Sequence, residues 1–252
     1  MANDNNNNHR LAVLIDADNA QPSVIQELLA EVSRYGTATI KRAYGDWTKS
    51  HLKGWKDVLH ALAIQPMQQF SYTSGKNATD AALIIDAMDV LHDGKVDGFC
   101  LVSSDSDFTR LATRIREAGL TVFGFGEQKT PEAFQAACDK FIFTEILRND
   151  VPPAAQEKEA EPGPSLPPLR PMILAALQAV ARDDGWAILG PVGSHITKNN
   201  PSFDARNYGF AKLGELMRKQ PYLEVKDAPV GDGSAHVHIL VRSRPGQTGP
   251  AA

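Results

Sequence analysis

Aspartates stand in three short motifs in the first part of the chain, each beside a predicted strand or helix. Residues 16–19 (Asp-Ala-Asp-Asn) and residues 103–107 (Ser-Ser-Asp-Ser-Asp) each follow an apolar run. Asp80 opens a predicted helix that also carries Asp86. Clustered carboxylates repel one another unless a cation neutralises them, and Mg²⁺ or Mn²⁺ prefers such oxygen ligands. A divalent cation held by carboxylates activates water in phosphodiester cleavage, so this is the chemistry that the motifs predict if they meet.

The candidate metal ligands are one aspartate from each motif: Asp16, Asp80 and Asp105. Asp86 lies six residues beyond Asp80, about 120° around a helix, so the two cannot both face one cation. We therefore expect Asp86, and likewise Asp18, to support the site without ligating. A simpler explanation exists for any single aspartate, because an acid before a helix often only caps it, and this alternative also fits Asp107, which precedes the predicted helix at 108–118. Capping does not explain three converging motifs, since unpaired carboxylates destabilise one another.

The segments that must position these acids alternate between strand and helix patterns. Runs of apolar and β-branched residues predict strands at 11–15, 38–44, 63–67, 98–103 and 120–125. Helices are expected at 22–35, at 52–62, from a cap at Thr79 to 92 with Gly94 after it, and at 108–118 with Gly119 after it. This alternation predicts an α/β fold, a mostly parallel sheet with helices on both faces. Ligands of such sheets gather at the carboxyl ends of the strands, where the acidic motifs stand.

Composition is that of an ordinary globular protein and excludes several other classes. Of the 252 residues, 42% are hydrophobic and 22% are charged, which excludes a wholly disordered chain and a fibrous repeat. No apolar run approaches the ~18 residues that cross a bilayer, and the Asn-rich start does not resemble a secretory signal. Cys100 and Cys138 do not have the spacing of a zinc knuckle. We expect a protein of the reducing cytoplasm, without membrane association.

Charge and proline content divide the chain into two parts. Residues 1–150 contain 15 Lys and Arg against 20 Asp and Glu, a net charge of −5, whereas residues 169–252 contain 10 against 7, a net charge of +3. Six prolines fall between 151 and 168, a composition typical of a semi-extended linker. The predicted organisation is therefore a tail, a first domain, a linker, a second domain and a second tail, at residues 1–9, 10–148, 149–168, 169–243 and 244–252.

The first domain resembles a known family. The stretch Ile-Asp-Ala-Asp-Asn-Ala at 15–20, the Lys76-x-x-x-Asp80 motif and the Val-Ser-Ser-Asp-Ser-Asp-Phe stretch at 102–108 resemble NYN domains, which belong to the PIN-like ribonucleases. The resemblance covers about residues 10–147. It implies a Rossmann-like, PIN-like sandwich and a site that cleaves RNA with Mg²⁺ or Mn²⁺. By motif position, the family's acidic site corresponds to Asp16, Asn19, Asp80, Asp105 and Asp107.

Two features beside the acidic motifs bear on that resemblance. Family members commonly have Gly where Ser104 and Ser106 stand, and Ser is small enough to keep the loop while tightening it. Residues 41–56 mix five cations with three aromatic side chains, a combination that tracks phosphates and stacks bases. We name Arg42, Trp47 and Lys76 as candidate RNA contacts. The alternative for this stretch is a solvated helix face with one Trp in the core.

The second domain combines helices with a hairpin. Residues 169–182 and 204–219 predict helices, and 223–225 and 236–241 predict the two strands of a β-wing. This small winged-helix-like α+β domain resembles the LOTUS (OST-HTH) domain over about residues 169–243, most clearly in the sequence Gly-Trp-Ala-Ile-Leu-Gly-Pro-Val-Gly-Ser. The resemblance implies binding of RNA, structured or G-rich RNA included, or docking to a protein partner. The candidate contacts are Lys198, Arg206, Tyr208 and Lys212.

Three functions compete at this point. The preferred one is a two-part ribonuclease, in which the acidic site cuts single-stranded or loop RNA and the basic domain holds it. The second is a non-catalytic RNA-binding or protein-docking adaptor with a vestigial acidic site. The third is a phosphatase with an Asp-x-Asp nucleophile motif after the first strand, which Asp16 and Asp18 superficially match. That class has Gly-Thr or a close equivalent after the second Asp, whereas Asn19-Ala20 stands here.

Overall fold

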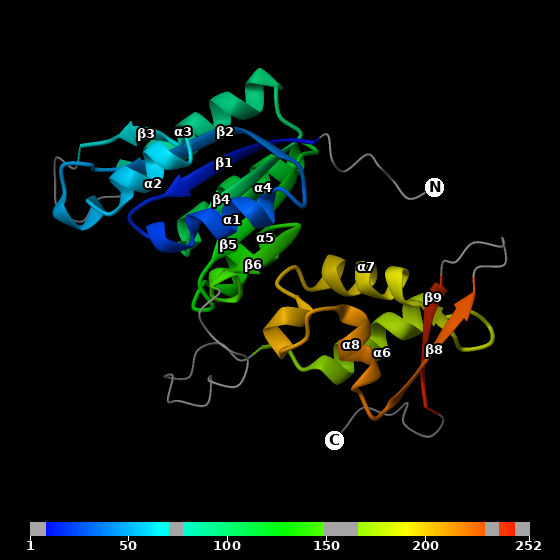
Figure 1. Cartoon of the computed structure of the whole chain (residues 1–252). Coiled ribbons are helices and arrows are strands. Elements are labelled where there is room, and N and C mark those ends of the chain that lie inside the picture. The colour runs from blue at the N-terminus through cyan, green and yellow to red at the C-terminus, as the bar shows by residue number, and fades with distance from the viewer. Residues whose placement is uncertain (1–8, 71–77, 149–165, 230–236, 245–252) are drawn as a thin grey trace. The chain divides into compact units, whose positions relative to one another are not determined.

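The computed structural model describes residues 9–70, 78–148, 166–229 and 237–244. The chain divides into two compact units, residues 1–155 and 156–252 (Figure 1). Lys76, all but one residue of each predicted tail (1–8 and 245–252 of the two) and most of the predicted linker lie outside the described residues.

A parallel sheet of six strands forms the first unit. The strands are β1 (Arg10–Asp16), β2 (Thr37–Gly45), β3 (Gln65–Gln68), β4 (Gly98–Val102), β5 (Thr121–Gly126) and β6 (Lys140–Phe143). They pair in the order β3-β2-β1-β4-β5-β6. The chain therefore changes direction across the sheet between β1 and β4, which places a topological switch point at their carboxyl ends. All five predicted strands are confirmed. The four-residue β6 was not predicted.

Helices and short 3₁₀ turns connect these strands. They are η2 (Pro22–Val24), α1 (Ile25–Val32), η3 (Ser50–Leu52), α2 (Trp55–Ala61), α3 (Ala78–Asp93), η4 (Ser106–Phe108), α4 (Thr109–Glu117), α5 (Glu132–Ala137) and η5 (Thr144–Leu147). Gly94 and Gly119, at φ +63° and +83°, follow α3 and α4 in left-handed conformations, as predicted. The prediction that Thr79 caps α3 was wrong, because Thr79 lies inside that helix. The short helix α5 was not predicted.

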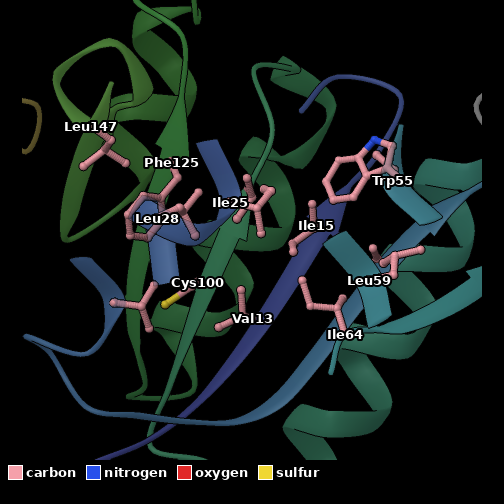
Figure 2. Packing of buried hydrophobic residues seen from close by; sticks show 14 of the residues in the cluster. Val13, Ile15, Ile25, Leu28, Trp55, Leu59, Ile64, Cys100, Phe125 and Leu147 are labelled. Carbon is pink, nitrogen blue, oxygen red and sulfur yellow. The ribbon is translucent and has the colours of Figure 1, made fainter. Parts of the chain in front are cut away.

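The helices α1 and α2 pack on one face of the sheet. Val13 and Ile15 of β1 are fully buried against Ile25 of α1 and against Trp55 and Leu59 of α2 (Figure 2). The intervening β1 residues are buried as well, which explains why the strand reads as a continuous apolar run. Each such side chain stabilises the fold by about 1.5–3 kcal/mol relative to an exposed one. This anchoring fixes the position of Asp16 at the end of β1.

An aromatic cluster holds the segment that follows β4. Phe108, directly after the third acidic motif, is 1% exposed and lies 6.4 Å from Phe134, measured between ring centroids. Phe134 in turn lies 5.7 Å from Phe141 of β6. Because Phe108 is anchored in this way, the backbone of residues 103–107 is held at both ends.

The described residues of the second unit form four helices or helical turns and a three-stranded antiparallel sheet. Its elements are α6 (Leu169–Val180), β7 (Ala187–Ile188), α7 (Leu189–Asn199), η6 (Ala205–Tyr208), α8 (Leu213–Arg218), β8 (Leu223–Pro229) and β9 (Val237–Ser243). The strand order is β7-β9-β8. The first helix and the hairpin are confirmed. Across both units, no helix of the described ranges is long and apolar enough to cross a membrane.

The predicted single helix over 204–219 was wrong. The chain forms the 3₁₀ turn η6, reverses at Gly209 (φ +80°), and begins α8 only at Leu213. A left-handed glycine cannot continue an α-helix, so Arg206 and Lys212 do not share one helical face. The helix α7 was not predicted, because Gly190, Pro191 and Gly193 lower the helix propensity of its sequence.

Candidate active site

Three carboxylates gather at the carboxyl edge of the sheet. Asp80 lies in the first turn of α3, and Asp105 and Asp107 lie in the loop and turn that follow β4. One carboxylate oxygen from each residue lies within 4.8 Å of the others, a spacing that fits a single metal ion. The fold thus brings the second and third sequence motifs together as expected.

Asp16 stands beside these three carboxylates, but its side chain is engaged differently. The residue is fully buried at the end of β1. Its Oδ2 accepts hydrogen bonds from Asn19 Nδ2 at 2.7 Å and from Ser103 Oγ at 2.8 Å. Burial raises the pKa of Asp16, while the hydrogen bonds from Asn19 and Ser103 oppose that rise. Asp16 is not one of the three residues within 4.8 Å of one another, and its role as a metal ligand stays a prediction.

Asp80 shows that negative charge accumulates in the site. The pKa of this carboxyl is raised from 3.8 to about 6, first by burial and then by the charges of Asp16, Asp105, Asp107 and Asp18. A proton or a cation relieves this repulsion. The donor set is entirely carboxylate oxygen, which suits a hard divalent cation such as Mg²⁺ or Mn²⁺.

Ser103 links the first and third motifs. Its buried hydroxyl donates to Asp16 Oδ2 and accepts a hydrogen bond from the backbone N–H of Asp105 at 3.0 Å. Ser103 belongs to the third acidic motif, but no role was predicted for it from the sequence. The signal was a hydroxyl directly at the end of a buried strand, next to a carboxylate on the neighbouring strand.

Asp105, and not Asp107, caps the turn that follows. Asp105 Oδ1 accepts a hydrogen bond from the backbone N–H of Asp107 at 2.9 Å, and α4 has no side-chain cap of its own. The alternative explanation of Asp107 as a cap was therefore wrong, and its exposed carboxylate lies in the acidic group. The hydroxyl of Ser104, where the family commonly has Gly, accepts from Glu127 N at 2.9 Å and ties the loop to the end of β5.

The two predicted supporting acids have partners outside the cluster. Asp18 Oδ1 lies 3.0 Å from His51 Nε2, which joins the first acidic loop to η3. Asp86 accepts hydrogen bonds from Tyr44 Oη and Arg42 Nη1, both from β2. Asp86 thereby holds α3 against β2. Arg42, a candidate RNA contact, is ion-paired in this network.

The two tryptophans of the cation-rich stretch differ in exposure. Trp55 is 1% exposed and belongs to the core, as the alternative explanation expected for one Trp. Trp47 is half-buried, and its Nε1 donates to the backbone oxygen of Met67 at 3.1 Å. Its position as an RNA contact stays a prediction.

In the second unit, the four candidate contacts divide into two pairs. Lys198 and Lys212 are exposed. Arg206 instead forms a bidentate pair with Asp204, at 3.0 Å from Nε and 2.8 Å from Nη2. Tyr208 Oη donates to the backbone oxygen of Pro167 at 2.8 Å, and burial raises its pKa to about 12. The more accessible charges are therefore those of the two lysines.

Comparison with models of known protein families shows which family this chain belongs to. Residues 10–147, more than half of the chain, match the model of the NYN domain. The chain belongs to the NYN family. Residues 164–234 match the OST-HTH/LOTUS domain, in the order that the sequence predicted. The chain is thus a nuclease-type RNA-binding protein, and its NYN domain carries an acidic cluster.

Solved structures similar to parts of this NYN protein come from several bacteria. A protein of unknown function from Vibrio parahaemolyticus is 18% identical, covering 56% of this chain and 94% of its own, with a TM-score of 0.45. A Chromobacterium violaceum fragment is 42% identical (31% and 82% covered, TM-score 0.27). An uncharacterized Nitrosomonas europaea protein is 29% identical (35% and 90% covered, TM-score 0.28). No curated protein matches the chain.

Proposed function

We propose that this protein is a Mg²⁺- or Mn²⁺-dependent ribonuclease that hydrolyses RNA phosphodiester bonds and captures its substrate through the C-terminal module. The observation that carries the proposal is the convergence of Asp80, Asp105 and Asp107, whose carboxylate oxygens lie within 4.8 Å of one another. Membership of the NYN family supports the same chemistry. The protein acts in the cytoplasm, where its two buried, free cysteines stay reduced.

Different residues of the site have different proposed roles. Asp80, Asp105 and Asp107 would hold the cation, with Asp16 as the neighbouring carboxylate that completes the site. A bound divalent cation would supply Lewis-acid activation of the attacking water and stabilisation of the leaving oxygen. Asn19 and Ser103 orient Asp16 by hydrogen bonds, and Ser103 also fixes the backbone that carries Asp105.

Substrate capture is assigned to the exposed lysines of the second unit. Lys198 and Lys212 are accessible for phosphate contacts, while Arg206 and Tyr208 first have to leave Asp204 and Pro167. Phosphate contacts of this kind supply affinity that falls with salt. The C-terminal module therefore holds the RNA, and the NYN domain cuts it.

Cleavage of a mixed RNA pool during titration with Mg²⁺ and Mn²⁺ tests the proposal. We expect activity that a chelator abolishes and that Asp105→Asn or Asp16→Asn lowers at least ~10²-fold, a typical loss for a key electrostatic group. Asp89→Asn, an exposed residue of α3, is the matched control and should cleave normally. Full cleavage by the Asp16→Asn/Asp105→Asn double variant at unchanged thermal stability would refute the nuclease assignment. RNA binding in chelator without cleavage in any metal would identify an adaptor.

A further inference from the structure

An open groove lies between α2 and β3 of the first unit. It has a volume of about 1080 Å³, and Leu59, Ile64 and Pro66 contribute apolar surface to it. Lys53 and Lys56 also line it, whereas none of the described residues in its lining carries a carboxylate. The groove therefore combines an apolar surface with positive charge, which complements a ligand that has both apolar rings and phosphates.

A tryptophan held in place forms part of this groove. Trp47 lines it, and the side-chain hydrogen bond from Nε1 to Met67 fixes one edge of the indole. Its ring packs edge-on against the core residue Trp55, at 6.3 Å between centroids and 70° between planes. An aromatic ring that is already immobilised loses little conformational freedom when a base stacks on it. Such stacking strengthens binding and tolerates any base.

Core packing connects the lining of the groove to the loop that carries the first acidic motif. Leu52, at the end of η3, lines the groove and packs closely on Gly45 at the end of β2. A Cβ added to Gly45 would lie 2.8 Å from Leu52 Cδ1 and 3.4 Å from Ala17 Cβ, so these segments touch. His51 of the same turn contacts Asp18 at 3.0 Å. The turn that contributes Leu52 to the groove therefore also contacts the first acidic loop.

We propose that the α2–β3 groove binds unpaired nucleotides of the RNA strand that flank the scissile phosphate. Bases contact Trp47 and the exposed Pro66, and phosphates contact Lys53 and Lys56. The inference rests on the proposed ribonuclease function. A base within a duplex reaches the groove only after unstacking and unpairing, which costs free energy that an unpaired base does not lose. The groove therefore makes single-stranded RNA the preferred substrate, whatever the second unit binds.

Binding of a fluorescent single-stranded RNA octamer to the full chain, in chelator, tests the charged part of the groove. We expect Lys53→Glu/Lys56→Glu to weaken binding about tenfold and to reduce the log–log salt slope by about 1.4, since each phosphate contact on a single strand contributes about 0.7. Lys95→Glu/Arg114→Glu makes the same charge change on exposed positions near the opposite, amino-terminal edge of the sheet, and should change neither quantity. Equal loss in both double variants would overturn the assignment.

Photocrosslinking locates the bases and separates the groove from the second unit. An octamer containing 5-iodouridine should crosslink to the peptide that contains Trp47, and an abasic octamer should bind more weakly than the intact one. Crosslinks confined to the second unit, equal affinity for the abasic octamer, or stronger competition by an acidic peptide than by RNA would each refute the groove as a nucleotide site.

Kinetics distinguish this inference from the nuclease proposal. If the wild type cleaves RNA and the Lys53→Glu/Lys56→Glu variant keeps the same KM, the groove inference fails and the nuclease stands. If the octamer crosslinks to Trp47 but no metal supports cleavage, the nuclease proposal fails and the groove remains a binding site. A raised KM with nearly unchanged kcat supports both.

Discussion

Replacing Asp80 with Asn should stabilise the metal-free protein while abolishing metal-dependent cleavage. Asp80 has its pKa raised to about 6 by burial and by four neighbouring aspartates, so its ionised form opposes folding at neutral pH. Asn has nearly the same shape and no charge. A structural Asp, such as a helix cap, would show the opposite behaviour and lose stability on this substitution.

The size of the effect follows from the change in pKa between the unfolded and folded states. The rise from 3.8 to about 6 corresponds to roughly 3 kcal/mol at most, at about 1.4 kcal/mol for each pKa unit. Asp80 is only partly buried, and solvent screening reduces the expected gain to about 1 kcal/mol. For a domain of this size that is about 2–4 °C in Tm.

The pH dependence has a defined sign. Above pH 6 the folded protein carries an unfavourable charge at Asp80, and the variant is more stable by the full amount. As the pH falls from 6 toward 4, the folded wild type binds a proton that the unfolded chain does not, so the wild type gains stability. Below about pH 4 both states are protonated, and the difference between wild type and variant disappears.

Thermal melting in chelator at pH 8, 6 and 4 measures this difference, with Asp89→Asn on the outer side of the same helix as control. At one hundred times its Kd, Mn²⁺ should stabilise the wild type by about 2.7 kcal/mol and thereby raise its Tm. It should not raise the Tm of the Asp80→Asn variant. A lower Tm for Asp80→Asn at pH 8 in chelator would refute the claim that the ionised Asp80 carboxylate opposes folding. An equal rise in the Tm of both proteins with Mn²⁺ would refute the claim that Asp80 helps to bind the cation.

Three further predictions address the supporting contacts and the two units. Ser103→Ala should lower the free energy of unfolding by about 1–3 kcal/mol, because Asp16 and the Asp105 N–H each lose a buried hydrogen-bond partner, and it should also lower cleavage. In melting and activity assays, the control Ser106→Ala, at an exposed position, should change neither quantity. A chain ending at residue 150 should fold and keep the chemistry, and limited proteolysis should first cut between 151 and 168; a truncated chain that does not fold contradicts this. Residues 165–245 alone should bind RNA in a salt-dependent manner, and Lys198→Glu/Lys212→Glu should abolish this binding. Arg206→Gln, which breaks the ion pair with Asp204, should mainly lower Tm. Absence of RNA binding at low salt would indicate a protein-docking module.

Much of the architecture of the first unit was predictable from local patterns. The run at 11–15 is apolar at every position because β1 is covered on both faces, and a continuous apolar run is the signature of such a strand. Gly94 and Gly119 end helices because glycine adopts the left-handed conformation without a Cβ clash. These signals depend on near neighbours in the chain, and for that reason they can be read from the sequence.

The second unit shows where local patterns mislead. Apolar residues recur at helical spacing over 204–219, yet Gly209 reverses the chain between η6 and α8. Conversely, Pro191 and two glycines obscure α7, which is stabilised by burial of Val192 and Ile196 in the core. At Gly209 the left-handed backbone ends the helical turn, whereas at α7 tertiary packing overrides helix propensity, because burying an apolar face outweighs a few tenths of a kcal/mol per residue.

The sequence by itself determined that acidic motifs stand at the carboxyl ends of β1 and β4 and at the start of α3, and that an acidic unit precedes a basic one. Only the tertiary structure decided which carboxylates converge. Asp80, Asp105 and Asp107 meet, whereas Asp16 turns to Asn19 and Ser103. The reason is that spacing along an element sets the direction of a side chain, but its hydrogen-bond partner comes from another element, 87 residues away for Asp16 and Ser103.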